Sequence, residues 1–215
     1  MPRPLPLAAA LAAHRTALAA CRRCTLGPGV RPVVSEAVSP RVMLVGQAPG
    51  RVEIDSGRPF SGRAGRTLFR WLARAGVDEA SFRRHVQIAA ITRCFPGAHP
   101  SGRGDRVPNP AERAACAPWL DAELAMIRPA VIIPVGRLAI DRFHGPRSLD
   151  ALVGREHVVT HAGGESVGIP LPHPSGASSW IHAPGHAALL DDALALLGRR
   201  LADLGVGTAP LRDVA

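Results

Sequence analysis

The stretch VMLVGQAPG, residues 42–50, decides the fold class of this chain of 215 residues. Its first four residues are apolar and the next five are rich in glycine and proline, a pattern that predicts a buried strand running into a tight loop. Similar apolar runs at Val86–Ile91, Val131–Val135 and Ile169–Leu171 predict three further strands.

Helical patterns separate these strands. The pattern is clearest near the C-terminus, where leucines recur at alternating steps of four and three and form one apolar stripe: Leu190, Leu194, Leu197, Leu201 and Leu204. Further helices are predicted over residues 7–20, Gly65–Ala75, Glu112–Ile127 and Leu138–Phe143. Strands that alternate with helices predict an α/β fold, a three-layer α/β/α domain over residues 1–215 with a central, mainly parallel four-stranded sheet.

Three loops follow predicted strands, at residues 46–60, 92–110 and 172–182. In open α/β sheets, ligands bind outside the carboxyl ends of the strands. We therefore expect these loops to meet around one crevice.

The charge of the chain predicts a polyanionic partner, because its formal net charge is +9. All 26 basic residues are arginines. Without a lysine, the chain can form no side-chain Schiff base and has no phosphate-binding Gly-Lys-Ser/Thr motif. These absences exclude a lysine-dependent DNA lyase and a P-loop nucleotidase.

The N-terminal apolar stretch Leu5–Ala13 only loosely resembles a secretion signal, because Pro6 interrupts it and His14 and Arg15 follow it. No apolar run is long enough to span a bilayer. We expect a cytoplasmic protein, with a monomer as the default state.

Cys21, Cys24, Cys94 and Cys116 are the four cysteines of the chain. The first two form a C-x2-C pair, which lets neighbouring thiolates bind one metal centre. Four thiolates suit either a [4Fe–4S] cluster or structural zinc, and spacing does not distinguish them. A disulfide, or free buried cysteines, are the alternatives.

Several motifs, in order along the chain, resemble those of the uracil-DNA glycosylase superfamily, and most closely its iron–sulfur families four and five. GQAPG at 46–50 and GRPFSGRAG at 57–65 resemble the first motif, and HPS at 173–175 resembles the second. The ITRC segment at 91–94, with PNP at 108–110 and then Cys116, is similar to the stretch between them. The resemblance covers roughly residues 20–200.

The resemblance implies a structural [4Fe–4S] cluster held by Cys21, Cys24, Cys94 and Cys116. It also implies that uracil flipped out of DNA enters the crevice. Phe60 would stack on the base, a contact of about 1–3 kcal/mol, although a core aromatic is the alternative. Backbone groups at Gly46, Gln47 and Ala48 would face the uracil or the attacking water.

We expect His173 to be the main catalytic residue. The resemblance implies that it donates a hydrogen bond to uracil O2 as negative charge develops there; a structural histidine is the alternative. Ser175 would contact a DNA phosphate, which positions the DNA without reading its sequence.

The sequence departs from its relatives at two positions. Family four has glutamate where this chain has Gln47, and an amide cannot take a proton from water. Family four also has an asparagine where this chain has Ala90. Uracil recognition then depends on backbone groups and Gln47, with Asn109 a doubtful substitute.

Glu53 and Arg93 are the residues expected to compensate. The Glu53 carboxylate would hold water or stabilise the cationic sugar, in preference to Asp55. Arg93 would stabilise the uracil anion or grip a flanking phosphate. For both residues, a role in the surface or the scaffold is the alternative.

Further contacts to DNA are expected from Arg63 and Arg66, although solvated arginines are the default interpretation. The chain lacks the Pro-Leu wedge that often follows the second motif, so Trp180 or Ile181 would fill the gap left by the base. We therefore expect activity on single-stranded as well as double-stranded DNA, since unstacking costs less in single strands.

These features predict a DNA repair enzyme that hydrolyses the bond between uracil and deoxyribose and leaves an abasic site. Gln47 and Ala90 keep a second hypothesis open, a protein that binds uracil or abasic DNA with little turnover. An unrelated zinc-stabilised α/β module is a third.

Overall fold

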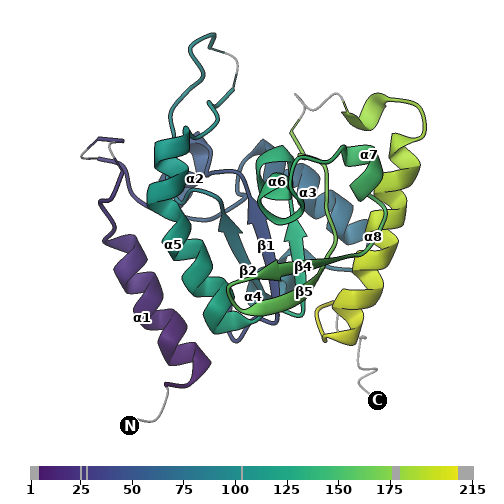
Figure 1. Ribbon diagram of the computed structural model, residues 1–215, viewed down its shortest axis with the longest axis horizontal. Helices are drawn as coiled ribbons and strands as arrows, with labels where there is room; N and C mark the ends of the chain where they lie inside the picture. The colour runs from purple at the N-terminus through teal and green to yellow at the C-terminus, as the bar shows by residue number, and fades with distance from the viewer. Residues whose placement is uncertain (1–4, 25, 28, 103, 176–179, 208–215) are drawn as a thin grey trace, which may run out of the picture.

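The centre of the protein is a five-stranded sheet with the order β2-β1-β3-β5-β4 (Figure 1). The computed structural model describes residues 5–24, 26–27, 29–102, 104–175 and 180–207. The strands are β1 (Val42–Gly46), β2 (Val86–Ala90), β3 (Val131–Pro134), β4 (His157–His161) and β5 (Gly164–Gly168). All neighbours pair in parallel except β4, which pairs antiparallel with β5.

The predicted α/β class and the mainly parallel sheet are confirmed, but the sheet has five strands rather than four. The fourth predicted strand, Ile169–Leu171, continues from β5 along β3, and the Leu171 amide donates to the Pro134 carbonyl at 2.9 Å. The β4–β5 hairpin has no apolar run, because β4 buries only Val159. Its position at the edge of the sheet explains why it was not predicted.

Helices cover both faces of this sheet. They are α1 (Leu7–Ala19), α2 (Arg51–Ser56), α3 (Arg63–Arg74), α4 (Glu79–His85), α5 (Pro110–Ile127), α6 (Arg137–His144), α7 (Leu149–Leu152) and α8 (His186–Asp203), with a 3₁₀ turn at Trp180–His182. The five predicted helices are confirmed within a few residues. Helices α2, α4 and α7 are at most two turns long, too short to show a periodic pattern.

Two apolar cores result from the alternation of side chains along β1. Val42 and Leu44 face the core that contains α3 and α8, whereas Met43 and Val45 face the core beneath α5 and α6. Helix α1 packs outside α5, and α8 lies on the opposite side of the molecule (Figure 1). The predicted three layers are therefore present, and the carboxyl ends of β1, β2 and β3 meet at one edge.

No helix in the described part of the chain is long and apolar enough to cross a membrane.

Candidate functional site

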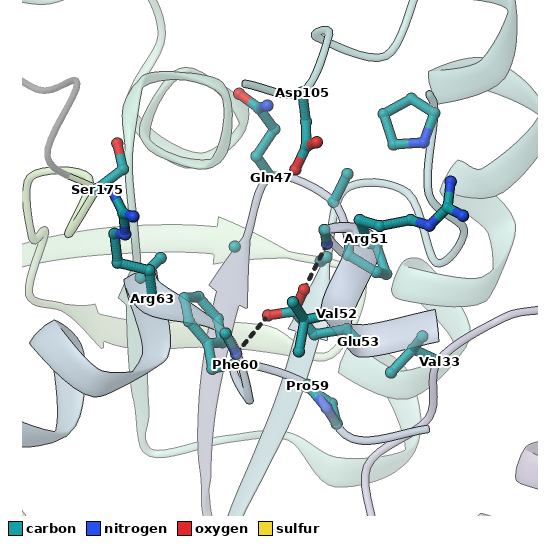
Figure 2. Close-up of a pocket in the computed structure, with 18 of the residues that line it drawn as sticks. Val33, Gln47, Arg51, Val52, Glu53, Pro59, Phe60, Arg63, Asp105 and Ser175 are labelled. Atoms are coloured by element: carbon teal, nitrogen blue, oxygen red, sulfur yellow. Dashed lines mark hydrogen bonds between the residues drawn. The ribbon is translucent and has the colours of Figure 1, made fainter. Parts of the chain in front are cut away.

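A cavity of about 650 Å³ opens at the carboxyl ends of β1 and β2 (Figure 2). The three loops predicted to converge all contribute to its wall. The residues expected around the base all line it: Gly46, Gln47, Ala48, Phe60 and Ala90. The predicted residues Glu53, Arg63, Arg93, His173 and Ser175 line it as well.

Phe60 is held in an unusual backbone conformation at the pocket wall. Its φ angle is +53°, a left-handed value that is rare for a bulky residue and often marks a functional site. Its ring lies against Gly46, where an added Cβ would come within 3.0 Å of the ring. Gly65 leaves room for the Phe60 carbonyl, which a Cβ there would meet at 1.7 Å. The two glycines of the first motif therefore make space for this aromatic ring.

Arg83, on α4, holds the Phe60 segment from outside the motif. Its guanidinium donates to the Pro59 carbonyl at 2.8 Å and to the Phe60 carbonyl at 3.1 Å. It also lies 4.5 Å from the centre of the Phe69 ring, in a cation–π contact. The left-handed turn is thus fixed by a planar, two-pronged donor.

Glu53 ties the two ends of the pocket loop together. Its Oε2 accepts from the Gly50 amide at 2.7 Å and its Oε1 accepts from the Gly62 amide at 3.3 Å, as Figure 2 shows. The side chain is buried. Both oxygens are engaged with the backbone, which favours a positioning role over the predicted contact with water or sugar.

The backbone of the first motif is fixed by the neighbouring strand. The amides of Ile91 and Thr92 donate to the carbonyls of Gly46 and Gln47 at 3.0 and 3.2 Å. The half-buried methyl of Ala90 leaves open space beside this loop. Asn109, the doubtful substitute, caps α5 with its side chain and does not line the pocket.

His173 is presented to the pocket as a neutral donor. The Ser175 amide donates to His173 Nδ1 at 3.2 Å, and the Ser175 hydroxyl lies 2.9 Å from the same nitrogen. Because an amide can only donate, Nδ1 is an acceptor and the ring proton is on Nε2. Burial lowers the pKa of His173, which keeps the ring uncharged near neutrality.

Gly136, at the start of α6, lies beneath the His173 ring. A Cβ at this position would come within 2.8 Å of the ring, and its φ of +81° also favours glycine. The absence of a side chain here allows the imidazole to pack closely against the backbone of Gly136.

Arg93 lines the pocket, but its guanidinium is directed into the protein. The side chain is 2% exposed and pairs with Glu123, which also faces His14 Nε2 at 3.2 Å. Although burial opposes it, Arg93 and His14 hold the pKa of Glu123 below its usual value. A side chain so buried is poorly placed for contact with a DNA phosphate, and its effect on the charge of uracil stays a prediction.

Only some of the residues predicted to contact DNA lie at the pocket. Arg63 and Arg66 are both exposed on the first turn of α3, and only Arg63 lines the pocket. Trp180 is engaged elsewhere: its indole donates to Asp150 at 2.6 Å and its ring stacks on His186 at 4.2 Å. Most of the loop expected to carry a wedge, residues 176–179, lies outside the described residues.

The four cysteines come from three separate segments: the loop after α1, the loop after β2, and α5. Burial, and then the charges of Cys116, Cys24 and Cys21, raise the pKa of Cys94 to about 12. The Cys116 sulfur accepts from the Arg93 amide at 3.3 Å, and the Cys21 sulfur accepts from the Trp119 indole at 3.2 Å.

Among the described residues, no three potential ligands lie close enough together to hold a metal ion. The donor set nevertheless fits a thiolate-bound cluster in its chemistry. All four side chains are thiols, the ligands that such a cluster requires, and two of the sulfurs accept hydrogen bonds, which stabilise thiolates.

Three residues of the site were not predicted from the sequence: Arg83, Asp105 and Gly136. Asp105 lines the pocket from the loop after β2, and it is the only acidic residue between Arg93 and Asn109. A lone acidic residue in this loop was the one feature of the sequence that could have marked Asp105 as a site residue. No local pattern marks Arg83 or Gly136, because their roles arise from contacts distant in sequence.

The fold and the site together define a class: an α/β protein with a pocket at the carboxyl ends of its strands, bounded by an aromatic ring and a histidine. Comparison with known proteins gives the family. The uracil DNA glycosylase superfamily matches residues 33–197, and the chain belongs to it.

Named relatives agree with this assignment. The type-4 uracil-DNA glycosylase of Thermotoga maritima is 33% identical over 159 residues, 72% of this chain and 77% of the relative. That of Sulfurisphaera tokodaii is 29% identical over 165 residues, 73% and 70% of the two chains. The type-5 enzyme of Mycobacterium tuberculosis is 36% identical over 99 residues, 41% and 34% of the two chains. The predicted resemblance to families four and five is confirmed.

Proposed function

We propose that the protein hydrolyses the N-glycosidic bond of uracil in DNA, releasing uracil and leaving an abasic site. The observation that carries this proposal is one cavity lined by the Phe60 ring and a neutral His173. The names of the type-4 relatives support the same activity.

The pocket suits a base turned out of the DNA stack. Phe60 offers an aromatic face, and stacking on such a face contributes about 1–3 kcal/mol per base. Gly46 and Ala90 add no bulk near it, and the backbone around Gln47 and Ala48 offers polar groups to the base edge. Selectivity for uracil then depends on these groups rather than on a side-chain amide at position 90.

His173 supplies the electrostatic part of the reaction. When the bond between C1′ and uracil N1 breaks, its electron pair leaves with the base, and negative charge spreads to O2. A neutral imidazole whose Nε2–H points at that oxygen stabilises this charge without giving up its proton. The hydrogen bonds from Ser175 hold the ring in the required tautomer.

The remaining residues support this chemistry. Glu53 fixes the shape of the loop between Gly50 and Gly62, and Gln47 orients water without accepting its proton. Arg63 supplies positive charge at the pocket mouth, and the net charge of +9 favours binding to the DNA backbone. Roles of Ser175, Arg66 and Trp180 in contacting DNA belong to this proposal, as do monomeric and cytoplasmic states.

The four cysteines, Cys21, Cys24, Cys94 and Cys116, would hold a [4Fe–4S] cluster. Bound there, the cluster would supply a structural crosslink between three distant segments. It would fix the end of β2, and with it the pocket wall next to Arg93.

Single-turnover cleavage of a single-stranded oligonucleotide containing one uracil tests the proposal, with a thymine oligonucleotide as the matched control. We expect uracil release and an alkali-labile abasic site from the uracil strand alone. Tight binding of uracil DNA by cluster-loaded protein without cleavage would overturn the proposal and favour the binding-protein hypothesis.

A further inference from the structure

Asp105 presents a carboxylate to the pocket from a loop that neither motif contains. The loop projects beyond the edge of the sheet (Figure 1) and closes into a short hairpin, in which Ala98 bridges Asp105. On one side, the Arg106 amide donates to the Gly97 carbonyl at 3.0 Å. On the other, the Arg106 guanidinium forms a two-pronged pair with Glu112 on α5, at 2.5 and 2.9 Å. Asp105 is therefore anchored at a defined place.

The Asp105 carboxylate lies against the first motif. A Cβ built on Gly50 would meet Asp105 Oδ2 at 3.0 Å and Glu53 Oε2 at 2.7 Å. Two carboxylates from different loops thus approach the same point beside Gly50. Figure 2 shows Gln47 at the same end of the pocket as Asp105.

The two carboxylates differ in what they bind. Both oxygens of Glu53 accept from backbone amides. Within the described residues, the Asp105 carboxylate takes part in no hydrogen bond or ion pair. Of the two acids, Asp105 is the one with oxygens free to bind a molecule in the pocket.

We propose that Asp105 is a catalytic residue that holds the attacking water and takes its proton, and so replaces the acid absent at position 47. This inference rests on the proposed function. The Gln47 amide would be the second partner of the same water.

The step is an ordinary hydrolysis. The bond between C1′ and uracil N1 breaks, and its electron pair leaves on the uracil facing His173. The water oxygen forms a new bond to C1′, and the proton that the water loses passes to an oxygen of Asp105. No oxidant, reductant or further reactant is needed.

The charges around Asp105 favour this role. Burial, and then the charge of Glu53, raise the pKa of Asp105 above its ordinary value of 3.8. A base whose pKa lies closer to the working pH accepts a proton more readily. The other charged or titratable groups that line the pocket are Arg51, Arg63, Arg93, Arg106 and His173. Of these, Arg93 is paired with Glu123 and Arg106 with Glu112.

The test compares Asp105→Asn with the wild type in single-turnover cleavage of uracil DNA between about pH 4 and 8, a range that starts near the ordinary pKa of an aspartate. The matched control is Asp55→Asn, which removes the same charge from an exposed position on α2 outside the pocket. We expect Asp105→Asn to cleave about 100-fold more slowly, and to bind uracil DNA as tightly as the wild type or more so. The wild-type rate should rise with pH until Asp105 is ionised, and this acid limb should vanish in the variant.

An Asp105→Asn variant with the wild-type rate and acid limb would overturn the inference and leave the proposed function intact. A rate that falls only in parallel with DNA binding and thermal stability would also overturn it, because that result indicates a structural role. Absence of cleavage by the wild type would overturn the proposed function, and this inference with it.

Discussion

Two neighbouring residues determine the tautomer and the position of the His173 imidazole. The Ser175 amide fixes the tautomer, and Gly136 provides the space in which the ring lies. Neither contact involves a charged group, so the ring remains a neutral donor. The contribution of this residue therefore depends on geometry more than on a charge partner.

Gly136→Ala should separate this geometry from general backbone strain. Gly136 and Gly145 both combine a positive φ with a ψ near 180°, a region open almost only to glycine. Alanine at either position should lower the free energy of unfolding by about 1–3 kcal/mol. Only Gly136→Ala should also slow uracil release by more than about tenfold, because only its Cβ meets the His173 ring. Denaturation and single-turnover rates measure both effects, and equal rates for the two variants would refute the packing role.

At this scale, the sequence predicted residues whose chemistry lies within a motif. Phe60 and His173 were found because their motifs keep them at fixed spacing from glycine or proline. Asp105 and Arg83 were not, because they act across gaps that only the folded chain closes. Arg93 shows a different case: its place beside Cys94 suggested a group that acts on uracil or DNA, whereas its ion pair with Glu123 arises from a residue 30 positions away in sequence.

Among the elements, the short helix α4 supports the pocket loop through Arg83. It has seven residues and its Asp78 cap accepts from the Ser81 amide, which sets the direction from which Arg83 reaches the pocket loop. The left-handed backbone of Phe60 is thereby supported by a helix that does not itself line the cavity.

Arg83→Lys should loosen this support, since an ammonium cannot reproduce the two-pronged contact with the Pro59 and Phe60 carbonyls. We expect a loss of about 1.5–3 kcal/mol in the free energy of unfolding. Uracil release should slow as well, because the ring that stacks on the base is less well held. Arg84→Lys is the control, since Arg84 is exposed and makes no such contact. The role assigned to Arg83 fails if the two variants behave alike in both measurements.

Elements with a long periodic or apolar pattern were predictable, and those determined by their position in the fold were not. Strands β1, β2 and β3 are buried on both faces and therefore read as apolar runs. The β4–β5 hairpin is polar because β4 lies at the edge of the sheet and β5 is only half covered. Helices α2 and α4 lack a long apolar stripe, although they shape the pocket loop.

For the molecule as a whole, the cysteines lie on segments that are not strands of the central sheet. The loop after α1 joins the rest of the protein near α5, where Trp119 contacts Cys21 and α1 packs against α5. A bound cluster would fasten this outer helix to the end of β2.

Cys116→Ser therefore tests the cofactor as well as the architecture. The purified wild-type protein should absorb broadly near about 400 nm if it carries [4Fe–4S], and Cys116→Ser should lose this absorbance along with thermal stability. The control is Ser166→Ala, which removes a buried hydroxyl on β5 that donates to the Pro129 carbonyl and should leave the absorbance unchanged. A colourless wild-type protein that contains one zinc would contradict the cluster.

We propose that the loops at Gly46–Phe60 and His173–Ser175 form one pocket in which uracil is excised. The most direct test of this proposal is the single-turnover release of free uracil by the wild type, by His173→Ala, and by His161→Ala as a histidine control on β4, outside the pocket. The predicted result is rapid release by the wild type and the control. His173→Ala should be slower by about 10²–10³-fold, with DNA binding retained. Full activity of His173→Ala would contradict the account.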